Sequence, residues 1–228
     1  MLNDLLAVWF PQCCWNCKQP LAIKQKWLCV NCSTQLPKTY FENEENNALK
    51  LLLRQYLPLE GAYAPFYFLQ HSPIQALIHA LKYQGKKKVA DWIAQQSAQL
   101  IPKEHPALEC DGIVPVPLHQ SKQRKRGYNQ VTGFGQYWAT RLGVPYLDQL
   151  LVRKNQTKTL VRMSREARWE EVKNAFSIQS KKEYKHLLLV DDVITTGATL
   201  TACGNTLLNG TCTKISVLGM AYAQNILP

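Results

Sequence analysis

Two neighbouring carboxylates and the hydroxyl-rich turn after them are the residues best suited to chemistry in this sequence. Asp191 and Asp192 follow the apolar run at 187–190, which has the length and composition of a strand buried on both faces. The turn comes next and consists of Thr195, Thr196, Gly197, Ala198 and Thr199. A helix that begins in this turn would point backbone N–H groups at a phosphate dianion, and Gly197 would let the backbone approach closely.

The two carboxylates need a different partner, because like charges keep them away from the phosphate itself. Ionised Asp191 and Asp192 accept hydrogen bonds and could hold the vicinal hydroxyls of a sugar. The predicted ligand is therefore a sugar phosphate at the carboxyl end of a strand, where open α/β sheets bind their ligands. The alternative is a strand–turn–helix whose acidic pair has no function.

A cluster of cysteines near the N-terminus is the second group of candidate functional residues. Five of the eight cysteines lie in the first 32 residues, and four of these form two C-x-x-C pairs that are eleven residues apart: Cys14, Cys17, Cys29 and Cys32. Pairs with this spacing turn their thiolates toward one tetrahedral Zn²⁺. Cys13 could replace Cys14 as the first ligand, and the alternative to a metal site is a set of buried free thiols. Four thiolates close the coordination shell, so we predict a structural zinc and no zinc catalysis.

The cysteine pairs define a small N-terminal module over residues 1–42. Its main apolar side chains are Trp9, Trp15 and Trp27, which are too few to hold a fold without a metal or a cross-link. Metal binding would therefore supply folding free energy. A polar stretch at 42–47 separates this module from a second predicted domain at 43–228, with a leading part at 48–110 and a ligand-binding core at 111–228.

The second domain has the alternation of helices and strands that is typical of α/β proteins. Apolar residues recur at helical spacing between 74 and 100 and are interrupted by Gly85 and three lysines, which predicts two helices joined by a basic turn, with Pro102 ending the second. Such alternation indicates a parallel sheet flanked by helices. Later in the chain the pattern predicts a helix at 199–208 and strands at 112–117, 144–151, 187–190 and 214–220.

Positive charge is concentrated in the second half of the chain. The formal net charge is +11, and residues 122–168 contain 11 Lys and Arg against two acids. Such a field attracts polyanions, either nucleic acid or a phosphate-rich small molecule. A solvated basic loop is the simpler alternative. The candidate contacts with a polyanion form one segment, consisting of Lys122, Arg124, Lys125, Arg126, Gly127, Tyr128, Asn129 and Gln130.

The composition also excludes several classes of protein. Apolar residues make up 46% of the chain and charged residues 19%, which argues against a disordered chain. No apolar run approaches the roughly 20 residues that a helix needs to cross a bilayer. The apolar stretch at 5–10 is too short for the core of a signal peptide, and no basic residue precedes it. We therefore expect a cytoplasmic protein without membrane insertion.

Residues 187–199 resemble, at all thirteen positions, the phosphoribosyl-pyrophosphate (PRPP) signature of type I phosphoribosyltransferases. Four further segments, at 81–85, 114–118, 124–130 and 168–176, resemble hallmarks of the ComF family. That family joins an N-terminal cysteine zinc module to a phosphoribosyltransferase-like domain and is associated with natural competence and DNA uptake. The resemblance implies a type I phosphoribosyltransferase-like parallel sheet, a small zinc ribbon and partners in the competence machinery.

The resemblance further implies how PRPP would be held. Asp191 and Asp192 would bind the 2′- and 3′-hydroxyls of the ribose, and residues 195–199 would bind its 5′-phosphate. Mg²⁺ would bridge the pyrophosphate, since a compact polyphosphate needs a hard cation with oxygen ligands. The pyrophosphate would meet a turn that contains Pro117, Leu118 and His119.

The resemblance also implies a catalytic role for the basic segment. Residues 124–130 would form a mobile loop that closes over the site, with Gly127 as its hinge. The positive charge that stabilises the departing pyrophosphate would come from Lys122, Arg124, Lys125 and Arg126. The predicted catalytic residues are Arg124, Arg126, Asp191 and Asp192. The family pattern is broken at Leu160 and Glu171, where Gln and Asn are expected. Those two positions are therefore not assigned to ligand contact.

Two functions follow from these patterns. The first is a PRPP- and Mg²⁺-binding protein of DNA uptake, either an enzyme that displaces pyrophosphate at the anomeric carbon or a binding module without catalysis. The second is a single-stranded DNA-binding or handover module that uses the basic tract at 122–168. The sequence does not identify the acceptor substrate that an enzyme of the first kind would use.

Overall fold

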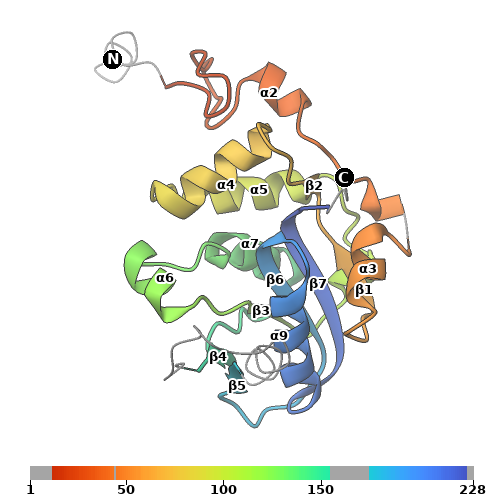
Figure 1. The fold of residues 1–228 in the computed structure, drawn as a ribbon. Coiled ribbons are helices and arrows are strands. Elements are labelled where there is room, and N and C mark those ends of the chain that lie inside the picture. The colour runs from red at the N-terminus through yellow and green to blue at the C-terminus, as the bar shows by residue number, and fades with distance from the viewer. Residues whose placement is uncertain (1–11, 44, 155–174, 225–228) are drawn as a thin grey trace, which may run out of the picture.

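A parallel β-sheet forms the centre of the molecule in the computed structural model, which describes residues 12–43, 45–154 and 175–224 (Figure 1). The strand order is β1-β7-β6-β3, and β2 pairs with β7 alongside β1. Every pairing in this sheet is parallel, which confirms the predicted α/β sheet. The strands are β1 (Gly61–Tyr63), β2 (Phe66–Tyr67), β3 (Gly112–Pro115), β6 (Tyr184–Ile194) and β7 (Cys212–Tyr222).

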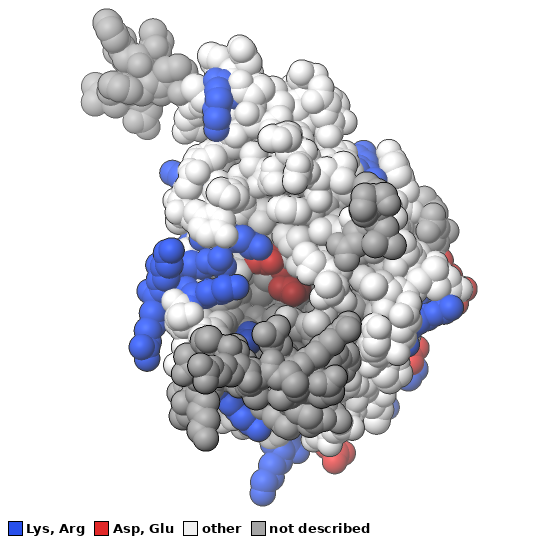
Figure 2. Space-filling model, viewed as in Figure 1, with Lys and Arg blue, Asp and Glu red and all other residues white. Residues whose placement is uncertain are grey.

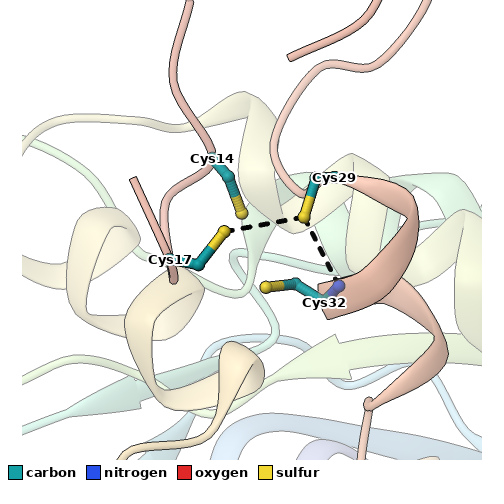
Figure 3. Close-up of side chains that lie close together, drawn as sticks. All are labelled: Cys14, Cys17, Cys29 and Cys32. Carbon is teal, nitrogen blue, oxygen red and sulfur yellow. Dashed lines mark hydrogen bonds between the residues drawn. The ribbon is translucent and has the colours of Figure 1, made fainter. Parts of the chain in front are cut away.

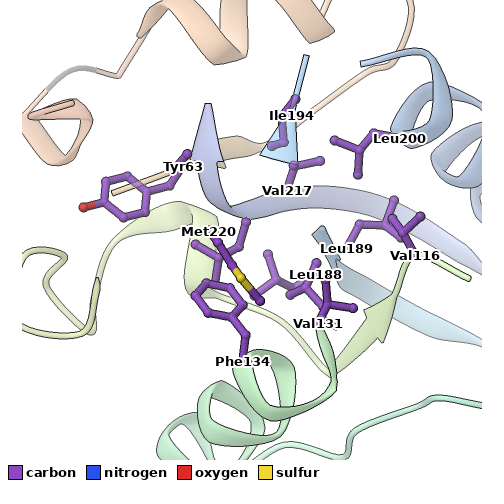
Figure 4. Close-up of a cluster of buried hydrophobic side chains, with 14 of the residues drawn as sticks. Tyr63, Val116, Val131, Phe134, Leu188, Leu189, Ile194, Leu200, Val217 and Met220 are labelled. Carbon is purple, nitrogen blue, oxygen red and sulfur yellow. The ribbon is translucent and has the colours of Figure 1, made fainter. Parts of the chain in front are cut away.

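The central strand β6 is apolar on both faces because helices cover both. Its four residues at 187–190 are fully buried, as the continuous apolar run predicts. Successive side chains point to opposite faces of a strand. Leu188 accordingly points toward Phe134 on one side of the sheet, whereas Leu189 lies on the side of Leu200 (Figure 4).

The helices form a layer on each face of the sheet. On the Phe134 side lie α4 (Pro73–Tyr83), α5 (Lys88–Ser97) and α7 (Thr132–Leu142), and on the Leu200 side lie α3 (Ala48–Leu53) and α9 (Ala198–Leu208). The predicted pair of helices at 74–100 is therefore confirmed, and α5 already ends at Ser97, before Pro102. Short helical segments complete the set: α2 (Val30–Thr34), α6 (Gln120–Arg126) and the 3-10 turns Phe41–Asn43 and Pro106–Leu108.

A separate antiparallel pair lies at the opposite end of the molecule from α2 (Figure 1). It consists of β4 (Leu151–Arg153) and β5 (Phe176–Ile178). The strand predicted at 144–151 is reduced to a single parallel bridge between Tyr146 and Ile113, after which Leu151 begins β4. Some predictions concern residues that lie outside the described part of the chain. These are the apolar stretch at 5–10, Leu160, Glu171 and the basic residues between 158 and 168.

The predicted fold class is confirmed in its main features. The structure has a parallel sheet with helices on both faces, and a small cysteine-containing module that carries α2 precedes it (Figure 1). The carboxyl ends of β6 and β7 point toward α4 and this module. In the part of the chain that the structure describes, no helix combines the length and the apolar character needed to cross a bilayer.

The start of α9 is packed so closely that only glycine is accommodated there. Gly197 has a φ of +74° and is buried, and a Cβ at this position would lie 2.3 Å from Leu53 Cδ2 on α3. The left-handed backbone and the contact with α3 are two separate reasons for glycine. Gly143, at the end of α7, has a φ of +70°, but a Cβ added there would meet nothing within 4 Å.

Gly197→Ala should therefore destabilise the protein more than Gly143→Ala does. The left-handed backbone alone costs an alanine about 1–2 kcal/mol, and overpacking against Leu53 adds about 1–3 kcal/mol at residue 197 only. Urea denaturation of both variants measures the two losses in free energy of unfolding. Equal losses would mean that α3 moves aside and that the close contact does not constrain the start of α9.

Candidate functional site

The acidic pair lies at the carboxyl end of the sheet, next to the turn after β3. Asp191 and Asp192 are in the last four residues of β6, which ends at Ile194. Pro115, the last residue of β3, is the parallel partner of Val190, and the N–H of Val116 donates to the carbonyl of Val190. The chain leaving β3 therefore starts beside Asp191, so the structure brings the predicted pyrophosphate turn and the acidic pair together.

Asp192 is the meeting point of three segments that are far apart in the sequence. Its Oδ1 lies 3.0 Å from Nζ of Lys82 in the last turn of α4. Its Oδ2 accepts a hydrogen bond of 2.7 Å from Nε2 of Gln130, just before α7. The Asp192 side chain is 9% exposed, and a carboxylate so buried is stable only with such partners. Since Oδ1 also accepts from the N–H of Val193, the open acceptor capacity is on Oδ2.

Asp191 has a different environment from that of its neighbour. It is half-buried, and its Oδ1 accepts a hydrogen bond of 2.8 Å from the backbone N–H of Asp192. Burial and the adjacent Asp192 carboxylate raise the pKa of Asp191 to about 7, against the opposing effects of Lys82 and Lys122. The Asp191 carboxyl group therefore changes its charge near neutral pH, and its ionised form is available to accept hydrogen bonds from a ligand.

The hydroxyl-rich turn leads from β6 into α9 as the sequence predicts. Thr195, Thr196, Ala198 and Thr199 are exposed, and only Gly197 is buried, against α3. The helix begins at Ala198 and has no side-chain cap at Gly197. Exposed backbone N–H groups at the start of an 11-residue helix can bind an anion.

His119 has a structural contact that the sequence does not reveal. It is the N-cap of α6, where its Nδ1 accepts a hydrogen bond of 3.2 Å from the N–H of Ser121 and lies 2.7 Å from the Ser121 hydroxyl. Pro117 and Leu118 precede it and are half-buried. The three residues thus form the turn between β3 and α6.

The prediction of a loop over 124–130 is wrong for its first three residues, which form the last turn of α6. Lysine, arginine and glutamine favour helix, and the His119 cap begins one here. Gly127 ends α6 with a φ of +73°. Lys122, Arg124 and Lys125 are exposed on this helix. Basic side chains gather beside a hollow in which acidic side chains lie (Figure 2).

The three residues after Gly127 attach this segment to the rest of the domain. The Tyr128 hydroxyl donates to the carbonyl of Leu81 at the end of α4. Nδ2 of Asn129 donates to the carbonyl of Val116 over 3.0 Å, and Gln130 is bound to Asp192. These contacts connect α4, the turn after β3 and the acidic pair.

Lys82 is the site residue that sequence reasoning misses. Its segment, 81–85, stands out in the sequence only as a family hallmark, without a role for the lysine. A signal is nevertheless present, because Ile74, Ile78 and Lys82 are spaced four residues apart and so share one face of a helix. A charged residue that continues an apolar stripe indicates a buried partner, here Asp192.

The cysteine cluster has the geometry of a metal site. The sulfur atoms of Cys14, Cys17, Cys29 and Cys32 point toward one another and all lie within 4.8 Å of one another (Figure 3). Zinc with four thiolates at about 2.3 Å in tetrahedral geometry has sulfur–sulfur separations of roughly 3.8 Å. Cys14 belongs to the cluster and Cys13 does not, so Cys14 is the candidate for the first ligand.

Local structure explains how the thiols converge. Cys29 is the N-cap of α2, and its Sγ accepts from the N–H of Cys32 over 3.5 Å. The side-chain amide of Asn16 donates to Sγ of Cys32 over 3.4 Å. Trp15 and Trp27 pack beside the cluster with ring centroids 6.1 Å apart. Such N–H groups orient thiolate ligands and offset their negative charge.

Sequence comparison identifies relatives over nearly the whole chain. Competence protein F of Haemophilus influenzae is 30% identical, and the alignment covers 92% of this chain and 96% of that protein. The DNA utilization protein YhgH of Salmonella typhimurium is also 30% identical, over 89% of this chain and 94% of that protein. The YhgH protein of Escherichia coli K12 is 28% identical, over 91% of this chain and 95% of that protein. No protein-family model matches the chain.

Similar solved structures include an amidotransferase and two phosphoribosyltransferases. The glutamine PRPP amidotransferase of B. subtilis has 19% identity and a TM-score of 0.39, and the match covers 60% of this chain but only 26% of that one. Orotate phosphoribosyltransferase of Aeropyrum pernix has 14% identity and a TM-score of 0.33, over 76% and 93% of the two chains. Adenine phosphoribosyltransferase of Thermoanaerobacter pseudethanolicus has 16% identity and a TM-score of 0.34, over 75% and 97%.

The fold class is defined by the strand order and the helix layers described above. The family, in contrast, is shown by the identity and coverage of the sequence relatives. The cysteine cluster that the structure assembles is consistent with that assignment. The chain belongs to the ComF family, that of Competence protein F.

Proposed function

We propose that this protein binds PRPP, as its Mg²⁺ complex, at the carboxyl end of β6 and acts in the uptake of DNA during natural transformation. One observation carries the proposal: an acidic pair, an exposed helix start and a basic helix surround the same end of the sheet. The role in DNA uptake is supported by the names of the relatives, a competence protein and a DNA utilization protein.

The groups of PRPP would be divided among these elements by charge. Residues 195–199 would bind the 5′-phosphate through backbone N–H groups, while Asp191 and the open acceptor position on Asp192 Oδ2 would hold the ribose hydroxyls. The Pro117–His119 turn and Lys122 would lie next to the pyrophosphate, whose oxygens would coordinate Mg²⁺. Lys82 would hold the Asp192 carboxylate in position through their ion pair.

The same arrangement could support transfer of the phosphoribosyl group. In such a reaction the bond between the anomeric carbon and the pyrophosphate oxygen breaks, and the acceptor forms the new bond to that carbon. Lys122, Arg124 and Arg126 would stabilise the charge that develops on the departing pyrophosphate. A protein that binds PRPP without catalysing this reaction would need only the groups that hold the 5′-phosphate and the ribose hydroxyls.

Calorimetric titration with PRPP and Mg²⁺ tests the proposal directly. The wild-type chain should bind, and the double variant Asp191→Ala, Asp192→Ala should lose binding because the ribose hydroxyls lose their acceptors. Glu60→Ala removes an exposed acid that pairs with Lys214 on β7, and it should bind PRPP as the wild type does. Absence of heat from the folded wild type at millimolar PRPP would refute the proposal.

PRPP binding should also depend on the charge of Asp191. Since its pKa is raised to about 7, the ionised fraction increases about tenfold between pH 6 and pH 8. PRPP affinity should rise by a similar factor over this interval and then level off. The PRPP phosphates also titrate, and the pH dependence that they cause should remain in Asp191→Asn, whereas the part caused by Asp191 should disappear. Identical profiles of PRPP affinity against pH for the variant and the wild type would contradict this role of Asp191.

We further propose that the cysteine cluster binds one structural Zn²⁺ per chain. Cys17→Ser should lose the zinc and lower the melting temperature, because the small module depends on the metal for its folding. Cys13→Ser, which changes an exposed neighbour outside the cluster, should retain both. Metal analysis by mass spectrometry and thermal melts with and without a chelator give the two readouts. A zinc-free wild type that is equally stable would refute the site.

A second candidate function is supported by a row of cation–aromatic contacts. Lys86 lies over the Trp15 ring at 5.6 Å, Lys87 over Tyr128 at 4.8 Å and Arg126 over Tyr83 at 5.4 Å. This row runs from the cysteine module across the turn between α4 and α5 to α6. Beside it, a groove of about 810 Å³ contains no acidic side chain among its described lining residues, which include Lys18, Lys24, Lys26, Lys86 and Lys88.

Alternating cations and aromatic rings are suited to single-stranded nucleic acid, whose phosphates and bases they contact in turn. We therefore propose that this row binds single-stranded DNA. Fluorescence anisotropy with an oligothymidylate should show affinity that falls with salt, at a log–log slope of about −0.7 per phosphate contact. Lys86→Ala should weaken binding and reduce the slope, whereas Lys181→Ala, an exposed lysine between β5 and β6, should not. A flat salt response would exclude this function.

A further inference from the structure

Arg126 is assigned to both proposed ligands, the pyrophosphate of PRPP and single-stranded DNA. It is the last residue of α6, is half-buried, and its guanidinium lies over the Tyr83 ring at 5.4 Å. Tyr83 is 60% exposed and belongs to the row of cation–aromatic contacts. The residue before it, Lys82, contacts Asp192 at 3.0 Å, and consecutive Cα atoms are only about 3.8 Å apart. Arg126 is therefore held close to the acidic pair and to the row at the same time.

Two segments, residues 81–87 and 126–130, connect these surfaces. The Tyr128 hydroxyl donates to a carbonyl of the first segment, so the two are bound side by side. Each segment sends one residue to the acidic pair, Lys82 from the first and Gln130 from the second. Other residues of both segments form the row of cation–aromatic contacts. A ligand that moves one segment at the acidic pair therefore also moves part of the row.

The end of α6 is free to change its contacts. None of the seven residues of α6 is buried. The helix ends at Gly127, whose φ is +73°, and a Cβ added there would meet nothing within 4 Å, so packing does not fix the backbone at this residue. A guanidinium over an exposed ring is weakly held, whereas its bidentate hydrogen bonds to a phosphate are among the strongest that a side chain makes. Arg126 should therefore leave Tyr83 when a phosphate comes within reach.

Both ligands would bind in one positive field. Basic side chains gather beside the hollow in which the acidic side chains lie (Figure 2). Lys82 and Lys122 are close enough to Asp191 to oppose the rise of its pKa. The phosphates of a strand and the pyrophosphate of PRPP would repel each other within the screening length, which is about 8 Å at physiological ionic strength. Shared cations and mutual repulsion both act against simultaneous binding.

We propose that PRPP, as its Mg²⁺ complex, releases single-stranded DNA from the row of cation–aromatic contacts. The pyrophosphate draws the Arg126 guanidinium away from Tyr83 and from the strand, which thereby loses one of its cations. By thermodynamic linkage, each ligand lowers the affinity of the chain for the other by the same factor. This release rests on the ligand binding proposed above for both surfaces, but it does not require transfer of the phosphoribosyl group. PRPP is then an effector of DNA release.

Fluorescence anisotropy of a labelled oligothymidylate bound to the full chain tests the release. Saturating PRPP with Mg²⁺, at constant ionic strength and constant free Mg²⁺, should raise the Kd for the oligothymidylate by about five- to thirtyfold. Ribose 5-phosphate lacks the pyrophosphate that would reach Arg126, so it should change this Kd by less than about twofold. Equal release by the Mg²⁺ complex of ATP at the same concentration would mean that phosphate charge alone displaces the strand, and would overturn the inference.

Two variants separate the role of Arg126 from that of the rest of the row. Arg126→Gln removes the shared charge and should reduce the effect of saturating PRPP on this Kd to less than about twofold. Lys86→Ala is the matched control, because Lys86 lies over the Trp15 ring in the cysteine module at 5.6 Å. It should weaken oligothymidylate binding and yet keep the full effect of PRPP. Thermal melts show that both variants are folded, and an Arg126→Gln variant that responds to PRPP as the wild type does would contradict the shared contact.

Separate titrations of PRPP and of the oligothymidylate distinguish this release from the proposed functions. If both bind the wild type and PRPP leaves the affinity for the oligothymidylate unchanged or raises it, the release is refuted while both proposed functions stand. If either ligand fails to bind alone, the corresponding proposed function is refuted, and the release with it.

Discussion

The ion pair between Asp192 and Lys82 is the interaction on which the arrangement of the site depends. It joins the central strand to α4 within a mostly buried environment, and the hydrogen bond from Gln130 adds the segment that precedes α7. Charged groups that are buried to this extent must be paired. Removing one partner of a buried ion pair typically lowers the free energy of unfolding by about 3–5 kcal/mol. The pair therefore constrains which segments can meet at the end of β6.

The surrounding contacts extend this constraint to the rest of the domain. Tyr128 is bound to the end of α4 and Asn129 to the turn after β3, so the residues between α6 and α7 bridge both. On the opposite face of the sheet, the close approach of Leu53 to Gly197 determines where α9 can begin. Polar contacts on one side and packing on the other thus place an exposed helix start beside two carboxylates with different electrostatic environments.

The cysteine module and the domain below it are connected by charge as well as by sequence. The carboxyl ends of β6 and β7 face α4 and the module (Figure 1). Lys86, in the turn after α4, lies over the Trp15 ring at 5.6 Å. A metal that organises the module would therefore also hold the aromatic part of the basic surface in place. In this chain, a cysteine cluster that could hold a metal ion and a candidate ligand site lie at the same end of the molecule.

The sequence by itself determined the local features. The unbroken apolar run at 187–190 required a strand buried on both faces, the helical spacing at 74–100 required two helices, and the paired cysteines required a common centre, because each of these is a short-range pattern with one physical solution. At 124–130 the family resemblance predicts a mobile loop, whereas residues 124–126 are helical, because lysine and arginine favour helix and the His119 side chain caps it. Only the tertiary structure decided that Lys82 and Gln130 meet Asp192, that Cys14 rather than Cys13 completes the cluster, and that Arg126 lies over Tyr83. These are contacts between residues distant in the chain, and no local pattern in a single sequence relates them.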